Sequence, residues 1–347
     1  MRNRRAAALL FAAMASAAAA PASRPAPSSK PAPSSKPEWA YAVPVPGQPA
    51  LPKIHEDGKV YGLPGSPLHF TRNKVQGLSD DGRKTRVAPA DWFPNEHPRM
   101  PKLVAEGDAA RKIVACALCH SPSGRGRSQN AGIAGLPAEY IVGQLHDMRA
   151  GLRQSAEPRK KNAGEMVEFA KAMTEKEIRE AAAYYAAIPW TGWMQVIETD
   201  TVPRMASADG MWLPLAGTAR EPLGERIIET PADVARTDLR DPHSGFIAYV
   251  PRGAVARGRR IVTTGNGGRI IACAVCHGAN LNGVGPIPGI AGRSPSYVAR
   301  QLYDMQQGAR HGAMASLMKP VVAKFSAQDI LAIAAYTASL PPGKPGR

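Results

Sequence analysis

Two Cys-x-x-Cys-His pentapeptides restrict this chain most strongly, because together they use all four of its cysteines. The first covers residues 116–120 and the second covers residues 273–277. Residues i and i+3 face the same way on one turn of helix, so two thiols can meet the two vinyl groups of a heme. The histidine after the second cysteine then lies beneath the iron as its proximal ligand. The pattern predicts two covalently bound hemes c, with Cys116, Cys119, Cys273 and Cys276 as attachment points and His120 and His277 as iron ligands.

A structural zinc site and a redox-active dithiol are the alternative interpretations of the same motifs. A structural zinc site needs four ligands, and no second cysteine pair stands near either motif. A duplicated Cys-x-x-Cys-His in an exported chain favours heme over both alternatives.

Export is indicated by the N-terminus. Residues 1–5 include three arginines, and residues 6–20 are an Ala/Leu/Phe run that ends in small residues. This predicts a secretory signal peptide over residues 1–20, with an uncleaved anchor as the alternative. No later stretch approaches about 18 consecutive apolar residues. We therefore expect a soluble periplasmic protein with no transmembrane segment after signal removal.

The next 80 residues are poor in regular patterns. A Pro-Ala-Pro-Ser-Ser-Lys hexapeptide occurs at residues 25–30 and again at residues 31–36. Such a composition predicts a semi-extended tether over residues 21–37. Residues 38–100 remain rich in Pro, Gly and Asp, with scattered aromatics. They are predicted to form an irregular arm that wraps over a folded domain through its aromatic side chains.

Most of the remaining chain is an internal repeat, here named copy one (residues 101–189) and copy two (residues 252–341). A shift of 157 residues relates the two motifs and also several side chains that follow them: Tyr140 and Tyr297, Gln144 and Gln301, Asp147 and Asp304, Arg153 and Arg310. The shift then falls to 152, because copy one has five extra residues around positions 157–163. Repetition of this kind predicts two domains of one fold.

Helix signals recur at matching places in both copies. Ser294 followed by Pro295 is typical of a helix start, and Gly151 and Gly308 are expected just beyond the end of the middle helix. Capping boxes predict the start of the last helix in each copy, at Thr174-x-x-Glu177 and Ser326-x-x-Asp329. Residues 190–251 instead contain short β-like runs between turns, which predict a small hairpin or ribbon that clamps the two copies.

The order of these motifs resembles class I cytochrome c, and the tandem arrangement resembles the diheme cytochrome c4 family. The resemblance covers residues 101–189 and 252–341. It implies a mainly α fold: two tandem class I cytochrome c domains with an irregular N-terminal arm and a small β-like insertion between them. In that family the distal iron ligand is a methionine placed just before the last helix. By position, the resemblance implies Met166 and Met318 as axial ligands.

Other methionines compete for the distal position. Met148 and Met305 also correspond, but they lie in the middle helix at a spacing typical of core packing. Met314 competes with Met318, although copy one has Asn162 at that place. Bis-histidine ligation is the weaker interpretation, because the histidines outside the two motifs do not correspond between the copies.

The proximal sides differ in sequence. Copy two has Pro-Ile-Pro-Gly at residues 286–289, which resembles the family's proline whose carbonyl can hold the second nitrogen of the proximal histidine. Copy one has Gln-Asn-Ala-Gly at residues 129–132 and no proline. We therefore expect the two hemes to differ in potential or in proximal rigidity.

The charge is unevenly distributed. The formal net charge of +16 falls to +13 when the signal arginines are removed. Residues 252–347 carry 12 basic and 2 acidic side chains, whereas residues 101–189 carry 13 and 10, and residues 190–251 carry 5 and 9. A basic face steers an acidic partner, although the acidic insertion could instead neutralise copy two internally. Nucleic acid is not expected as a partner outside the cytoplasm.

Three functions are compatible with these features. The first is an electron carrier between a donor dehydrogenase or membrane complex and a terminal acceptor, with no catalytic residues of its own. The second is an electron-transfer subunit of a dehydrogenase complex. The third is a diheme peroxidase, which needs an iron with an open distal site and is disfavoured by equivalent methionines in both copies. The expected partner is an acidic redox protein or a dehydrogenase or oxidase complex.

Overall fold

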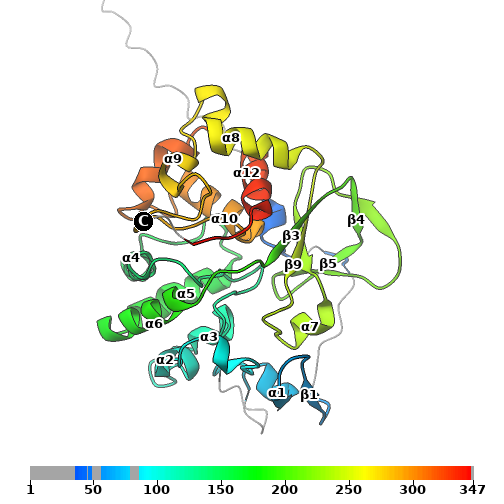
Figure 1. Cartoon of the computed structure of the whole chain (residues 1–347), viewed down its shortest axis with the longest axis vertical. Coiled ribbons are helices and arrows are strands. Elements are labelled where there is room, and N and C mark those ends of the chain that lie inside the picture. The colour runs from blue at the N-terminus through cyan, green and yellow to red at the C-terminus, as the bar shows by residue number, and fades with distance from the viewer. Residues whose placement is uncertain (1–35, 45, 49–55, 79–85, 345–347) are drawn as a thin grey trace, which may run out of the picture. The chain divides into compact units, whose positions relative to one another are not determined.

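The computed structural model describes residues 36–44, 46–48, 56–78 and 86–344, whose arrangement is shown in Figure 1. The expected signal peptide and nearly all of the expected tether lie outside these residues. Within them, both copies are helical and most strands belong to the segment between the copies. The mainly α class with a β insertion is therefore confirmed. No helix in the described part of the chain is both long and apolar enough to cross a membrane.

Copy one consists of short and medium helices around one apolar core. Its elements are α2 (Lys102–Ala105), α3 (Cys116–His120), α4 (Ala138–Arg149), α5 (Lys161–Ala172) and α6 (Glu175–Ala187). The expected capping box starts α6, because Thr174 accepts from the N–H of Glu177 and Glu177 accepts from the N–H of Thr174. Ile178 and Tyr185 of this helix are fully buried against the other helices. The last helix thereby closes the core of copy one.

Copy two repeats this plan with a longer first helix. Its elements are α8 (Ala254–Gly268), α9 (Ala274–His277), α10 (Pro295–Gln306), the 3-10 turn η3 (Ala315–Met318), α11 (Lys319–Val322) and α12 (Ala327–Ser339). The Ser294 side chain caps α10, and a second capping box starts α12 at Ser326, as predicted. The last helices of the two copies therefore start alike, whereas α4 of copy one has Pro137 at its N-cap and no side-chain cap.

The first and last helices of copy two pack at very close range. A Cβ on Gly258 of α8 would lie only 2.0 Å from the carbonyl oxygen of Ala332 in α12, so only glycine fits at this crossing. Ile261 and Ile330 are fully buried beside it. Near its end α8 is interrupted by residues 265–267, which have positive φ angles. By the repeat offset, copy one has only the four-residue α2 in the place of α8. The first helix is thus a major difference between the copies.

The segment between the copies forms a small β structure rather than a single ribbon. Strands β3 (Met194–Glu198), β9 (Phe246–Val250) and β8 (Ile228–Pro231) make one sheet in the order β3-β9-β8. β9 is parallel to β3 and antiparallel to β8. Two further antiparallel pairs join β4 (Thr201–Pro203) to β7 (Arg220–Pro222) and β5 (Met205–Ala208) to β6 (Met211–Pro214). The short helix α7 (Val234–Asp238) precedes β9.

The N-terminal arm is irregular and held by aromatic side chains, as predicted. It contains η1 (Glu38–Ala40), β1 (Val60–Gly62) paired with β2 (His69–Thr71), α1 (Arg72–Val75) and η2 (Pro94–Glu96). Trp92 is 1% exposed, and its indole N–H donates to the carbonyl of Leu239 at 2.7 Å. Tyr41 is also buried. The arm is therefore part of the folded structure.

Candidate heme-binding sites

The first motif lines a large cavity in copy one. Helix α3 places Cys116, Cys119 and His120 in the wall of this cavity, and Met166 of α5 lines the same space. Its volume of about 180 Å³ greatly exceeds the roughly 10–15 Å³ that a single water needs on the same measure. Much of the remaining wall is apolar: Ile113, Ile133, Leu136, Ile141, Leu145 and Phe169. The space therefore fits a large apolar group that bears its attachment points on α3.

Both proximal histidines are oriented by the same backbone hydrogen bond. The Nδ1–H of His120 donates to the carbonyl of Ala131 at 2.8 Å, and that of His277 donates to the carbonyl of Pro288 at 2.8 Å. Positions 131 and 288 are equivalent under the shift of 157 residues. The lack of a proline in copy one therefore does not abolish the bond, and the expected difference in heme potential stays a prediction. In both copies Nε2 is left as the free ring nitrogen.

The protonation states also fit heme attachment. Burial lowers the pKa of His120 and of His277, which favours the neutral imidazole that a metal ligand requires. Burial raises the pKa of Cys116 to about 12 and that of Cys273 to about 11. Reactive dithiols have lowered pKa values instead, and none of the four cysteines forms a disulfide. The residues thus fit a covalent heme c better than a redox dithiol.

The distal side of copy one offers more than one thioether. Met166 lies on α5 and lines the cavity together with the two thiols and the histidine of the motif. Met148 and Met173 line the same cavity. The structure therefore brings together the whole expected ligand set of copy one, and the choice of Met166 over its neighbours stays a prediction.

In copy two, two of the four expected residues pack against one apolar cluster. Cys273 and Met318 pack against the same buried core, whereas Cys276 is exposed. Met318 is the last residue of η3. Met314, its competitor, precedes this turn and is 47% exposed. The packing favours Met318 over Met314 as the residue directed toward the core.

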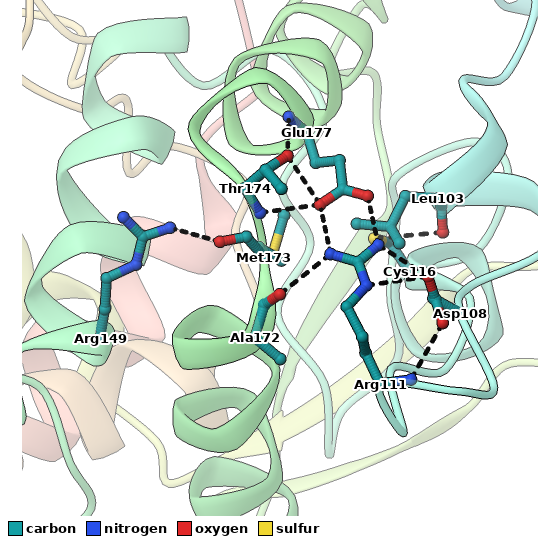
Figure 2. A network of polar contacts seen from close by, with 9 residues as sticks. All are labelled: Leu103, Asp108, Arg111, Cys116, Arg149, Ala172, Met173, Thr174 and Glu177. Carbon is teal, nitrogen blue, oxygen red and sulfur yellow. Dashed lines mark hydrogen bonds and ion pairs between the residues drawn. The ribbon is translucent and has the colours of Figure 1, made fainter.

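An arginine ties the segment before the first motif to the last helix of copy one, as Figure 2 shows. The Arg111 guanidinium donates to both carboxylate oxygens of Glu177 at 2.9 and 2.5 Å and to the carbonyl of Ala172 at 3.0 Å. Because Arg111 donates to it, the pKa of Glu177 is lowered to about 2. Glu177 also belongs to the capping box of α6. The network therefore joins the start of α6 to the segment that precedes the first motif.

Copy two contains an equivalent arginine network, which the shift of 157 residues does not reveal. Arg269 donates to the carboxylate of Asp329 at 2.8 Å and to the carbonyl of Lys324 at 3.1 Å. Ala172 and Lys324 correspond under the shift of 152 residues, as do Glu177 and Asp329. Arg111 stands five residues before its cysteine and Arg269 only four, so a fixed offset misses the pair. The capping boxes were the available signal, because both arginines bind the acidic residue of a box.

The repeated side chains within and just after the middle helices join the two copies. The Arg153 side chain donates to Tyr297 and Gln301 of copy two at 3.1 Å each. Reciprocally, Arg310 donates to Tyr140 at 3.0 Å and to Gln144 at 2.7 Å. Arg153 and Arg310 also form a backbone bridge. The Tyr, Gln and Arg positions that define the repeat are therefore interface residues, and the long insertion does not keep the copies apart.

Comparison with known proteins agrees with this geometry. A family model described as Cytochrome c matches residues 255–341, which lie in copy two. Cytochrome c4 of Azotobacter vinelandii is 26% identical over 244 residues, which are 68% of this chain and 90% of that protein. The thiosulfate dehydrogenase electron acceptor of Stutzerimonas stutzeri (strain A1501) is 26% identical over 243 residues, covering 69% and 85%. The chain is a cytochrome c4-like protein.

A solved structure is similar over a comparable stretch. Thiosulfate dehydrogenase from Marichromatium purpuratum is 29% identical, with a TM-score of 0.45, and the match covers 69% of this chain and 39% of that one. As a cytochrome c4-like protein, the chain carries heme c and transfers electrons. It is a carrier rather than an enzyme.

Proposed function

We propose that this cytochrome c4-like protein binds two hemes c and passes single electrons in the periplasm, between a donor dehydrogenase or membrane complex and a terminal acceptor. The observation that carries the proposal is the matched 2.8 Å bond from each proximal histidine to a backbone carbonyl. In this proposal each heme is attached through its own motif, at Cys116 and Cys119 or at Cys273 and Cys276. His120 with Met166 would hold one iron, and His277 with Met318 would hold the other.

The chain's residues offer two ligands to each iron. Heme c, when bound, would supply an iron that cycles between ferric and ferrous states by one electron. The histidine and methionine of each copy would hold that iron and leave no position on it for substrate. The network of Arg153 and Arg310 holds the two copies together. This arrangement suits a relay that stores and passes electrons without binding substrate.

The surfaces beside the two motifs differ in exposure. In copy two, Ile271 is 50% exposed and Val275 is 75% exposed. Their equivalents in copy one are Val114, which is buried, and Leu118, which is half-buried. The apolar surface beside the second motif is therefore open, and an electron-transfer partner can approach the heme there most closely.

Two segments outside the repeat cover the first motif. Gly77 of the arm lies so close that a Cβ on it would be 2.7 Å from Cδ1 of Leu118. The carbonyl of Arg86 accepts the N–H of Ala115 at 3.0 Å. From the insertion, Arg240 donates to the carbonyl of Leu118 at 2.7 Å. These contacts support copy two, and not copy one, as the docking domain.

The charge of copy two indicates the chemistry of the partner. Arg259, Arg260 and Lys319 are exposed and form no ion pair with any described residue. Arg257 is different, because it binds the carboxylate of Asp329 at 3.0 Å. The free basic residues around an open apolar surface fit an acidic redox protein.

The test combines heme counting with electron-transfer kinetics. A denatured sample is expected to retain two covalent hemes per chain. Electron exchange with an acidic partner should slow as salt rises, and the Arg259→Glu/Arg260→Glu variant should slow it further. Lys102→Glu/Lys112→Glu is the matched control in copy one, where both lysines are exposed. Recovery of one heme, or equal effects of the two variants, would contradict the proposal.

A second candidate is an electron-transfer subunit of a dehydrogenase complex. It is favoured by the relative named thiosulfate dehydrogenase electron acceptor. The arm and the insertion would supply additional contact surface. Co-purification of a catalytic subunit with the full chain, and its loss when the arm is deleted, would support this candidate over a free carrier.

A further inference from the structure

The proximal loop of copy one is residues 129–131. Prolines within the equivalent loop of copy two make that loop rigid, whereas the loop of copy one is held by residues outside it. Proline fixes φ near −65°, so Pro286 and Pro288 restrict the loop that holds His277. No proline occurs at residues 129–132, yet the carbonyl of Ala131 holds His120 at the same 2.8 Å. Another source of order is needed for this loop.

The segment that contains the five extra residues of copy one, residues 157–163, brings two side chains onto this loop. The Asn162 amide donates to the carbonyl of Gln129 at 3.1 Å and to the Asn130 side chain at 2.6 Å. Lys160 donates to the same Gln129 carbonyl at 2.6 Å. These bonds fix the two residues immediately before Ala131. Their target is thus the segment that positions the carbonyl for His120.

The extra segment is itself anchored. Glu157 is 1% exposed, and its carboxylate accepts from Arg159 at 2.7 Å and from Lys36 of the expected tether at 2.5 Å. Arg159 also donates to Glu38 of the arm at 2.8 Å. The N–H of Ala156 donates to the carboxylate of Asp304 in copy two at 2.8 Å. A segment bonded to the arm and to copy two can hold a loop in place.

Copy two lacks this arrangement. Met314 occupies the position equivalent to Asn162, is 47% exposed and has no amide to donate. Each copy therefore has one means of holding its proximal loop: prolines in copy two, and side chains of the extra segment in copy one.

We propose that residues 157–163 act as a clamp that positions His120, with Asn162 as the principal positioning residue and the clamp replacing the prolines of copy two. The inference rests on heme attachment at the first motif, as proposed above. A firm Nδ1–H bond raises the basicity of the ligating nitrogen and stabilises ferric iron. Loosening the clamp should therefore raise the reduction potential of heme one and leave heme two unchanged.

The experiment compares Asn162→Ala with Met314→Ala in the full-length protein by spectroelectrochemistry and proton NMR of the ferric heme methyl groups. Asn162→Ala should raise the reduced-to-oxidised ratio of heme one at a fixed applied potential by about threefold. Loss of a direct partner of a metal ligand typically lowers metal affinity or activity by roughly 10–100-fold. We expect a smaller effect here, because Asn162 acts on His120 only through the loop. Met314→Ala should leave heme one unchanged.

Ala131→Pro provides the rescue, because it restores the proline of copy two at its equivalent position. Added to Asn162→Ala, it should return the potential of heme one toward the wild-type value. If Asn162→Ala does not fold, Asn162→Ser and Lys160→Met allow the same comparison. An unchanged heme-one potential in a variant that retains both hemes, or absence of rescue, would overturn the clamp. Recovery of only one covalent heme from the wild type would instead contradict the proposed function.

Discussion

The two copies reach the same histidine geometry by different means. Copy two relies on its own elements: a long α8 packed on α12 and prolines in the proximal loop. Copy one has a four-residue α2 and no proline at residues 129–132. Its loop is held by residues 157–163, and its motif is covered by the arm and the insertion. The histidine of each motif thus needs the same local geometry, whereas the residues that hold this geometry can come from distant parts of the chain.

The two copies also differ in how exposed the apolar residues beside their motifs are. The segments that stabilise copy one cover the apolar surface beside its motif, so Val114 is buried. Copy two holds its proximal loop with its own prolines and leaves Val275 exposed. Because electron transfer needs close approach, the copy whose proximal loop needs no outside support is also the copy whose motif a partner can reach.

The largest expected effect follows removal of a distal methionine. Met166→Ala or Met318→Ala should open one iron to carbon monoxide and lower its potential, while the other heme is almost unchanged, because thioether ligation favours ferrous iron. The weak sulfur-to-iron charge-transfer band of the ferric protein, recorded heme by heme, checks this. Met148→Ala and Met305→Ala should affect stability and leave the band intact. Wild-type protein that lacks the band at one heme would contradict equivalent ligation.

The helix crossing of copy two should be the most sensitive packing site. Gly258→Ala places a Cβ 2.0 Å from a backbone oxygen of α12. It should destabilise the protein by about 3 kcal/mol, at the upper end of ordinary overpacking costs. By contrast, a Cβ on Gly143 of α4 would meet nothing within 4 Å, so Gly143→Ala should stabilise by about 0.5–1 kcal/mol. Urea unfolding of both holoproteins measures the contrast, and equal effects would refute it.

The interface network should show coupling between the copies. Arg310 is buried, and Arg310→Ala leaves the Tyr140 hydroxyl without its donor and removes one of the two guanidinium donors to Gln144, which still accepts from Arg153 at 2.9 Å. Loss of a donor to buried polar groups costs about 1–3 kcal/mol, and we expect about 2. In a double-mutant cycle with Gln144→Ala, the combined loss should be clearly smaller than the sum of the single losses. Strict additivity would show that the two side chains act independently.

The smallest effect concerns acid stability. The pKa of Glu177 is lowered to about 2 in the folded protein, chiefly by Arg111, from an ordinary value of 4.5. Its stabilising contribution is therefore complete above about pH 4.5 and is lost as the pH falls toward 2. Glu177→Gln should flatten the pH dependence of unfolding in that window. Asp329→Asn should act similarly in copy two, where Arg269 and Arg257 help to lower the pKa of Asp329 despite its burial. An unchanged profile would contradict this role.

Much of the local structure could be predicted because its signals are local. Thr174 and Ser326 start helices by side-chain bonds to residues three positions away, and the sequence shows both partners. Gly151 and Gly308 follow their helices with positive φ, as expected for helix ends. Arg111 and Arg269 could not be paired, because their distances from the motifs differ by one residue. Their equivalence exists only in the contacts that they make.

The sequence by itself determined the two motifs, the repeat, the helix starts and the mainly α class, since each depends on residues close together or on a fixed offset. The tertiary structure decided how His120 is held, which motif is covered and how the copies meet. Those features depend on contacts such as Asn162 with Gln129 or Arg240 with Leu118, whose partners lie 33 and 122 residues apart. No periodicity or spacing encodes such a contact, because the path of the intervening chain selects it.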